Sequence, residues 1–237
     1  GICVFQGSPV KQAGIINNLQ AMAKTPILMC IDAEWGVGMR ILDSVLPLPK
    51  QMMLGAMKDA SIVYKYGQVV ADQCKRLGLH VDYAPVIDVN NNPDNPVIND
   101  RSFGEDKYKV ALFGTQYMRG MQDNGIMACA KHFPGHGDVS VDSHVDLPII
   151  NKSMAQLDSL ELYPFRQLFA AGIGSAMVAH LYIPAIDSTA NRATSLSKNN
   201  VTGLLRNKLH FEGLTVTGAL QMQGVKKFFP DGEASVQ

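Results

Sequence analysis

The sequence predicts an α/β fold built on a parallel sheet. Short apolar runs rich in β-branched residues alternate with longer amphipathic stretches along its 237 residues. The apolar runs are hydrophobic on both faces, which is typical of parallel strands covered by helices on either side. A hydrophobic content of 46% is enough for a substantial core. Repeated strand–helix units of this kind form either a closed barrel or an open doubly wound sheet.

Six of the apolar runs have the length of strands. They cover residues 2–5, 26–31, 81–87, 127–132, 175–180 and 214–217. The amphipathic stretches between them predict helices, over residues 10–23, 59–77, 106–124, 155–171 and 198–209. Asp59, Ser153 and Ser197 lie at the starts of three of these helices. They are candidate N-caps, because their side chains can accept hydrogen bonds from the unpaired N–H groups of a first turn.

Polar residues collect where several of these strands end. Asp32 follows the second strand, Lys131 and His132 end the fourth, and His180 ends the fifth. A (β/α)8 barrel places its functional residues at the C-terminal ends of many strands. An open sheet would use one switch point, usually with a Gly-rich phosphate loop, and neither G-x-G-x-x-G nor a Walker motif occurs. The sequence therefore favours the (β/α)8 TIM barrel.

The expected strands are too few for a closed barrel of this kind, which needs eight. We therefore expect residues 1–237 to form a single, partial barrel domain that lacks about one strand–helix unit at each end. No linker, low-complexity tract or internal repeat marks a second domain.

Composition argues against several classes of function. The formal net charge is zero and no block of like charge occurs, so nucleic acid and anionic membranes are not expected partners. No apolar stretch reaches the ~18 residues that a membrane span needs. The four cysteines are widely spaced, mostly in apolar runs, which predicts buried free thiols rather than disulfides or a metal cage.

The segment 131–148 is the most informative part of the chain. It holds three histidines, three aspartates and a lysine, in a Gly- and Pro-broken loop that follows a buried strand. This pattern is typical of an active-site loop. Asp142 and His144 are two residues apart and can project to one side of an extended segment, where the carboxylate would raise the pKa of the imidazole. A solvated histidine beside an unrelated aspartate is the other interpretation.

The spacing of two histidines in this loop also resembles a metal-binding pattern. His132 and His136 are four residues apart, which on a helix would allow both to bind zinc. Pro134 and Gly135 lie between them and exclude that helix, so we expect no metal site. Lys131 and His132 instead fit hydrogen bonding to a polar ligand, and pairing of Lys131 with a carboxylate is the structural alternative.

Other charged residues follow neighbouring strands. Asp32 and Glu34 begin a loop that reaches Arg40, and Arg101 follows the strand that leads to Asp88. Carboxylates and arginines make directional, charge-assisted hydrogen bonds, which suit a ligand rich in hydroxyl groups. Each of them alone is most often a solvated loop charge, and their shared position after successive strands makes them candidate binding residues.

Several segments of the chain resemble those of glycoside hydrolase family 3, specifically its bacterial β-N-acetylglucosaminidase branch. The matching segments, in family order, are 31–34 with Arg40, 84–89, 101–104, 131–137 with Asp142-Ser143-His144, and 213–217. The resemblance covers essentially the whole chain. Its Asp-x-His motif separates this branch from the β-glucosidases of the same family.

This resemblance implies a (β/α)8 barrel and the retaining hydrolysis of terminal β-linked N-acetylglucosamine, as in peptidoglycan fragments. It assigns His144 as the general acid/base, assisted by Asp142. The sugar-binding residues that it implies are Asp32, Arg40, Arg101, Lys131 and His132. No metal or organic cofactor is expected. The commonest role of the branch implies a cytoplasmic protein, and a periplasmic or secreted one stays open because a signal peptide could have been removed.

The chain departs from the family pattern at Gly218. Family members carry their nucleophilic aspartate here, directly after the strand at 214–217, in a Thr-Asp-Ala-Leu pattern. Glycine has no side chain that could form the covalent glycosyl intermediate of a retaining enzyme. An engineered change, a natural loss and replacement by a neighbouring carboxylate are the explanations, ranked in that order. We expect a chain that binds N-acetylglucosaminides and hydrolyses them very poorly.

Three other functions stay open on the residues alone. A non-catalytic N-acetylglucosamine-binding protein is favoured directly by Gly218. A metal-assisted barrel hydrolase would use the histidine cluster of the segment 131–148. β-Glucosidase specificity is opposed by Asp142 and His144.

Overall fold

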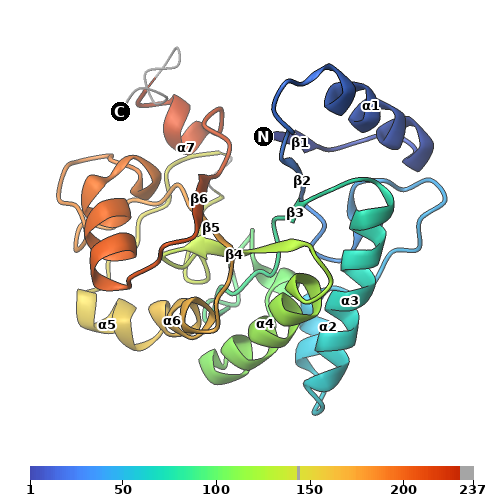
Figure 1. Ribbon diagram of the computed structural model, residues 1–237. Coiled ribbons are helices and arrows are strands. Elements are labelled where there is room, and N and C mark those ends of the chain that lie inside the picture. Colours follow the sequence, from blue (N-terminus) through green and yellow to red (C-terminus); the bar gives the residue numbers. More distant parts are fainter. Residues whose placement is uncertain (143–144, 230–237) are drawn as a thin grey trace.

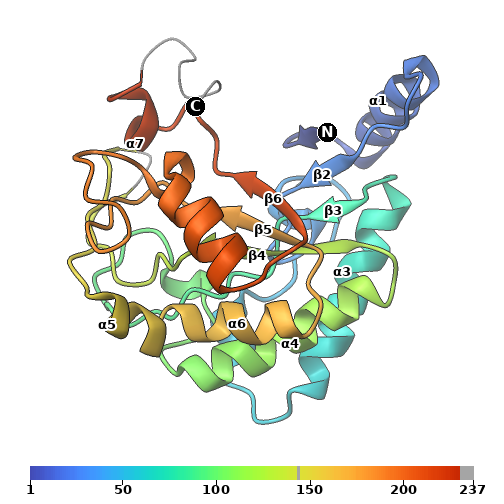
Figure 2. The ribbon, with the colours of Figure 1, turned by 60° about the vertical axis from the view of Figure 1, so that its left-hand side comes forward.

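The computed structural model describes residues 1–142 and 145–229. Within them, six parallel strands lie side by side in chain order and curve into a half-barrel (Figures 1 and 2). The strands are β1 (Ile2–Val4), β2 (Met29–Ile31), β3 (Val81–Asp82), β4 (Met127–Phe133), β5 (Ser175–Val178) and β6 (Leu214–Thr217). The parallel sheet and all six strand positions are confirmed. The closed eight-stranded barrel is not confirmed, because β1 and β6 are open edges of the sheet among the described residues.

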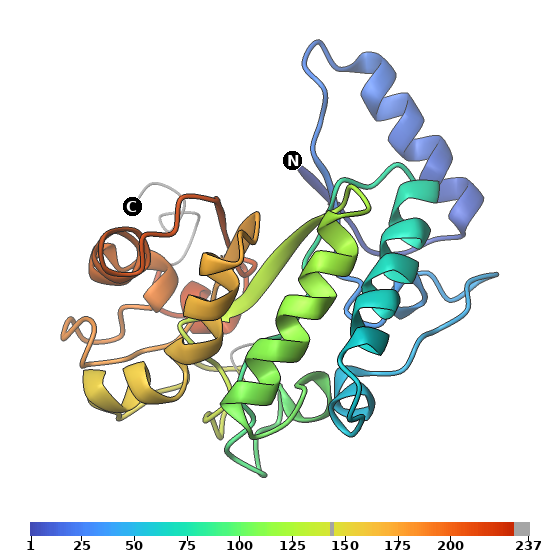
Figure 3. The same ribbon diagram turned by 60° about the horizontal axis from the view of Figure 1, so that its bottom comes forward.

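Helices separate the strands along the described part of the chain, and one more follows β6. They are α1 (Pro9–Met22), α2 (Gln51–Gly55), α3 (Ser61–Arg76), α4 (Lys107–Gln122), α5 (Met154–Ser159), α6 (Leu162–Ala170), a wide π-type helix η4 (Asn199–Lys208) and α7 (Gln223–Lys226). Short 3₁₀ turns lie at Val37–Met39, Asn99–Arg101 and Thr194–Leu196. In Figure 3, α3 and α4 pack side by side, whereas α1 stands apart at the N-terminal edge.

The third strand is shorter than the expected 81–87. Regular pairing ends at Asp82, although the N–H of Tyr83 still donates to the carbonyl of Ile31 at 2.8 Å, and Pro85 then has no N–H to donate to a neighbouring strand. The chain nevertheless continues beside β4, because the N–H of Ile87 donates to the carbonyl of Lys131 at 2.8 Å. This course places Asp88 next to the end of β4.

The expected helix at 155–171 is two helices, α5 and α6. In one continuous helix, Pro164 would remove a hydrogen bond to the carbonyl of Leu160. In α6 it lies in the first turn, where the N–H groups need no helical partner. Ser153 caps α5 and forms a capping box with Gln156, as its candidate role predicted.

The other two candidate caps act one residue earlier than the helix N-cap position. The Asp59 carboxylate accepts a hydrogen bond from the N–H of Ser61 at 2.9 Å. The Ser197 hydroxyl accepts one from the N–H of Asn200 at 3.2 Å. Both side chains therefore bond to first-turn donors, but the N-cap residues themselves are Ala60 and Lys198, so the prediction that Asp59 and Ser197 are N-caps is wrong by one position.

The structure also tests two expectations from composition. All four cysteines are free thiols, and Cys30, Cys74 and Cys129 are buried, as expected. Among the described residues, no helix combines the length and the apolar character needed to cross a membrane.

Helices α3 and α4 meet at two glycines. A Cβ atom at Gly120 would lie 2.1 Å from the carbonyl oxygen of Tyr64, and one at Gly67 would lie 2.4 Å from that of Tyr117. The rings of Tyr66 and Tyr117 pack edge to face beside this crossing, with centroids 5.2 Å apart. Only glycine allows this approach, which sets the distance between the helices that support β2 to β4.

We predict opposite effects of alanine at two helical glycines. Gly120→Ala forces a methyl group against the backbone of α3 and should lower the free energy of unfolding by about 1–3 kcal/mol. Gly14→Ala in α1 meets no atom within 4 Å, and should raise it by about 0.5–1 kcal/mol through helix propensity. Urea unfolding of both variants measures the difference, and equal midpoints would contradict the packing argument.

Candidate active site

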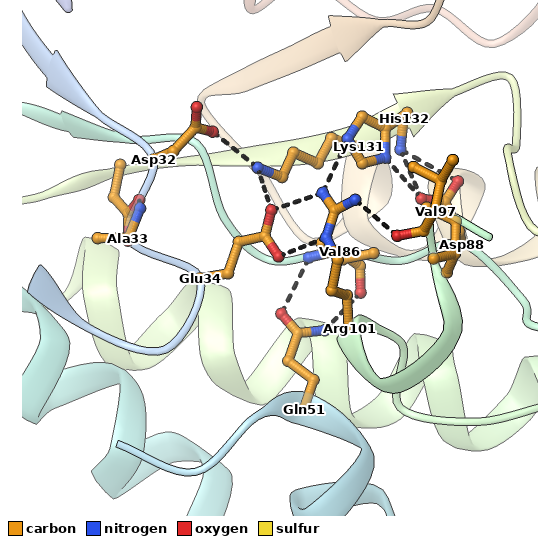
Figure 4. A network of polar contacts seen from close by, with 12 residues as sticks. Asp32, Ala33, Glu34, Gln51, Val86, Asp88, Val97, Arg101, Lys131 and His132 are labelled. Carbon is orange, nitrogen blue, oxygen red and sulfur yellow. Dashed lines mark hydrogen bonds and ion pairs between the residues drawn. The ribbon is translucent and has the colours of Figure 1, made fainter. Parts of the chain in front are cut away.

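A buried cluster of charged side chains lies at the C-terminal ends of β2 and β4 (Figure 4). The Lys131 ammonium is 2.9 Å from Asp32 Oδ1 and 2.7 Å from Glu34 Oε1. Arg101 binds the same glutamate through two parallel hydrogen bonds, Nε to Oε2 at 2.9 Å and Nη2 to Oε1 at 2.7 Å. Because Lys131 and Glu34 are almost completely buried, these contacts replace the water that both charges have lost.

The cluster keeps its members ionised. Burial by itself raises the pKa of the Glu34 carboxyl, but the charges of Lys131 and Arg101 outweigh burial and hold this pKa well below its ordinary value. The pKa of Asp32 is likewise lowered, against the effect of burial, chiefly by Lys131. Burial lowers the pKa of Lys131, yet Asp32 and Glu34 raise it above its ordinary value. The site therefore presents fixed charges at neutral pH.

Arg40 extends the cluster toward the surface. Its Nη2 lies 3.1 Å from Asp32 Oδ2, and its Nε donates to the Asp32 carbonyl at 3.3 Å. The guanidinium also packs over the Phe5 ring, 5.2 Å from its centroid. The side chains of Arg40, Asp32 and Arg101 are 31%, 19% and 20% exposed, so part of each polar group is open to a ligand.

His132 is held by a fully buried carboxylate. Its Nδ1 lies 2.7 Å from Asp88 Oδ2, and this carboxylate also accepts from the N–H groups of His132 and His136, at 3.1 and 2.7 Å. A carboxylate accepts hydrogen bonds, so Nδ1 carries the hydrogen and Nε2 faces Arg101 Nη2 at 3.4 Å. Burial lowers the pKa of His132 despite the attraction of Asp88, so the ring is neutral at pH 7.

The five residues expected to bind a sugar are therefore neighbours in the structure. Asp32, Arg40, Arg101, Lys131 and His132 form one continuous set of polar contacts with Glu34 and Asp88. Their role in sugar binding stays a prediction.

Of the three positions expected to take part in catalysis, the structure describes Asp142 and Gly218. The Asp142 carbonyl accepts from the N–H groups of Val145 and Asp146, at 2.9 and 3.1 Å. His144 lies outside the described residues. Gly218 directly follows β6, and its N–H donates to the carbonyl of Val178 on β5 at 3.1 Å. It thus lies at the same end of the sheet as the charged cluster, and its role stays a prediction.

Sequence analysis did not identify the residues that support the loop after β4. Three asparagine amides donate to it: Asn91 to Asp138 Oδ1 at 3.1 Å, Asn92 to the Val139 carbonyl at 3.2 Å, and Asn95 to the His136 carbonyl at 2.8 Å. The run Asn-Asn-Asn-Pro-Asp-Asn at 90–95 was a visible signal for this support. Repeated amides can hold a loop that has no secondary structure of its own.

Asp82 was also missed, although it fixes the loop after β2. It is completely buried, and its Oδ1 accepts from the N–H of Ala33 at 2.8 Å. Burial raises the pKa of this carboxyl to about 7. Ala33 stands between Asp32 and Glu34, so this bond helps to set the direction of both carboxylates.

Both ring nitrogens of His132 face protein groups, Asp88 and Arg101. In the part of the chain that is described, no three His, Cys, Asp or Glu side chains form a group that could hold a metal ion.

Comparison with known proteins places this geometry in a family context. A family model described as the glycosyl hydrolase family 3 N terminal domain matches residues 6–237. Beta-hexosaminidase A of Pseudoalteromonas piscicida is 34% identical over 232 residues, which cover 92% of the chain and 39% of that protein.

Two solved structures show the same fold. A glycoside hydrolase family 3 beta-N-acetylglucosaminidase from Paenibacillus sp. str. FPU-7 has 40% sequence identity and a TM-score of 0.95, covering 100% of this chain and 46% of that one. NagZ from Neisseria gonorrhoeae, in complex with N-trifluoroacetyl-D-glucosamine, has 27% identity and a TM-score of 0.87, covering 96% and 69%. The chain thus spans less than half the length of the Pseudoalteromonas and Paenibacillus proteins.

We predict that Asp82→Asn changes the pH dependence of stability. The folded pKa of about 7 lies above the ordinary value, so the folded wild type keeps a proton that the unfolded chain loses as the pH rises from 4 to 7. Wild-type stability should therefore fall over this range, by up to about 1.4 kcal/mol per pH unit from this group. Asparagine keeps the acceptor for Ala33 and does not titrate.

The free energy of unfolding of Asp82→Asn, relative to wild type, should thus rise from pH 4 to 7 and level off above it. Urea unfolding at half-unit pH steps measures this difference. Asp72→Asn, which removes an exposed carboxylate of α3, is the control for the loss of a charge. Parallel curves for wild type and Asp82→Asn would show that the buried carboxyl is ionised throughout.

Proposed function

The chain belongs to glycoside hydrolase family 3, and we propose that its site is that of a retaining β-N-acetylglucosaminidase. The Pseudoalteromonas relative is named a beta-hexosaminidase, and the Paenibacillus structure is named a beta-N-acetylglucosaminidase. The Neisseria structure holds N-trifluoroacetyl-D-glucosamine. Because the chain spans only part of their lengths, the activity of the whole protein is part of the proposal.

The charged cluster carries this proposal. Asp32 and Arg40 are paired and ionised side chains, partly open on the solvent side. Such groups make short charge-assisted hydrogen bonds to the hydroxyl groups of a sugar. Their mutual contacts hold them in place before the ligand arrives, so little conformational entropy is lost on binding. A terminal N-acetylglucosamine, as in peptidoglycan fragments, is the proposed ligand, and the cytoplasm the proposed compartment.

The proposed chemistry needs two further groups. His144, assisted by Asp142, would protonate the oxygen of the leaving group. A carboxylate at position 218 would attack the anomeric carbon, form a covalent glycosyl-enzyme, and release the sugar when water attacks with His144 as base. A histidine thus replaces the carboxylic acid that most glycosidases use. Gly218 cannot form the covalent bond, so this chain should bind N-acetylglucosaminides and hydrolyse them very slowly.

A non-catalytic N-acetylglucosamine-binding protein is the second candidate function. Gly218 favours it directly, because the binding residues are complete while the nucleophile is absent. Binding without turnover in every relevant assay would support this candidate.

We predict that Arg40→Ala weakens the binding of N-acetylglucosamine. The substitution removes a charged donor beside Asp32, and loss of such a hydrogen bond lowers affinity by about 10-fold or more. Isothermal titration calorimetry measures this change. Arg119→Ala, on the exposed side of α4, should bind as tightly as wild type. Equal affinity of the two variants would place the sugar elsewhere.

We also predict that Gly218→Asp creates hydrolytic activity. Loss of a catalytic nucleophile typically costs several orders of magnitude, so the variant should exceed wild type by at least about 1000-fold in kcat on an aryl β-N-acetylglucosaminide. The corresponding glucoside should be a poorer substrate. Gly203→Asp adds a carboxylate on the exposed surface of η4 and should leave activity unchanged. Comparable turnover by wild type and Gly218→Asp would show that position 218 does not supply the nucleophile.

A further inference from the structure

His180 lies directly against position 218. It follows β5 and is only 2% exposed. A Cβ atom built on Gly218 would be 2.9 Å from His180 Nε2 and 3.2 Å from its Cδ2. The imidazole therefore borders the space that a side chain at 218 would enter. The sequence indicated a polar residue at this strand end and gave it no role.

The hydrogen-bond partners of the ring determine which nitrogen carries a hydrogen. Nε2 is 3.1 Å from the carbonyl oxygen of Ala219, and Nδ1 is 2.7 Å from Ser195 Oγ. A carbonyl oxygen can only accept, so Nε2 carries a hydrogen in both the neutral and the protonated ring. His180 thus directs an N–H donor toward the segment 218–219.

The backbone around His180 is fixed by Thr194. Its Oγ1 donates to the Ala179 carbonyl at 2.7 Å and accepts from the N–H of Leu181 at 3.2 Å. Its own N–H donates to the Leu181 carbonyl at 2.7 Å. These bonds hold the backbone on both sides of residue 180. The Cα atom of His180 is therefore fixed, whereas the far end of its imidazole ring can still shift. A Cβ atom at position 218 requires the ring tip to move by about half an ångström to reach ordinary van der Waals distance.

We propose that His180 is the positioning residue for the nucleophilic carboxylate at position 218. Nε2–H would donate to one carboxylate oxygen and leave the other directed at the anomeric carbon of the sugar. A nucleophile must lie within about 3–3.5 Å of the carbon that it attacks, so orienting this short side chain has a large effect on rate. In the present chain the same N–H is taken by the Ala219 carbonyl. The proposal rests on the function proposed above and adds a residue to it.

A crystal structure of Gly218→Asp tests the contact without any activity. We expect a carboxylate oxygen of the introduced side chain within about 3.2 Å of His180 Nε2. A carboxylate turned away from the ring, more than about 4 Å from Nε2, would overturn the proposal.

Kinetics in the Gly218→Asp background test the effect on catalysis. His180→Phe keeps a ring of similar size and removes the donor, whereas His180→Gln keeps an N–H at a similar distance from the backbone. We expect His180→Phe to lower kcat on an aryl β-N-acetylglucosaminide by about 10- to 100-fold, with KM nearly unchanged. His180→Gln should recover most of this loss.

Ser197→Ala is the matched control, because it removes a nearby buried hydroxyl that bonds to Asp187 and not to His180. It should leave kcat unchanged in the same background. Equal kcat for His180→Phe and His180→Gln would mean that the ring acts only through packing, and would overturn the proposal. The crystal structure could show the carboxylate–His180 contact while the Gly218→Asp variant turns over no N-acetylglucosaminide. That result would refute the proposed function and still support the positioning contact.

Discussion

The buried ammonium of Lys131 is the constraint on which the rest of the site depends. It lies near the C-terminal end of β4, whereas its partners Asp32 and Glu34 follow β2, and β3 lies between these strands. Neighbouring strands are about 4.8 Å apart, so the pair must reach across about 10 Å. A long lysine side chain can span this distance when both strands end at the same edge of the sheet. Removal of the Lys131 ammonium would leave Asp32 with Arg40 and Glu34 with Arg101, so each carboxylate would lose one of its cationic partners at a largely buried site, which is destabilising.

Contacts from the neighbouring strand β3 and from helix α4 hold the two carboxylates in this geometry. Asp82 binds the backbone of Ala33 from the intervening strand, and the Tyr117 hydroxyl donates to the Glu34 carbonyl at 3.0 Å from α4. Gly120 permits α4 to pack closely enough on α3 for that layer to form. Helix packing and charge pairing therefore support the same two carboxylates.

The half-barrel places the charged cluster and position 218 on different strands. The charged cluster is built on β2 to β4, whereas Gly218 and His180 lie at the ends of β6 and β5. None of the hydrogen bonds reported for the cluster passes through residue 218. If the proposed function holds, a glycine in place of a carboxylate at position 218 would therefore leave the charged cluster unchanged.

The sequence by itself determined the order of the strands, the cap of α5 at Ser153 and the polar residues at strand ends, because each depends on residues close together in the chain. Pro85 and Pro164 even marked the two places where the expected elements are shorter or divided. Only the tertiary structure decided which polar groups meet. Lys131 and Asp32 are 99 residues apart, and His180 approaches Gly218 from another strand. Such partners are chosen by the curvature of the sheet and by the cost of leaving a buried charge unpaired, and neither is written in a local pattern.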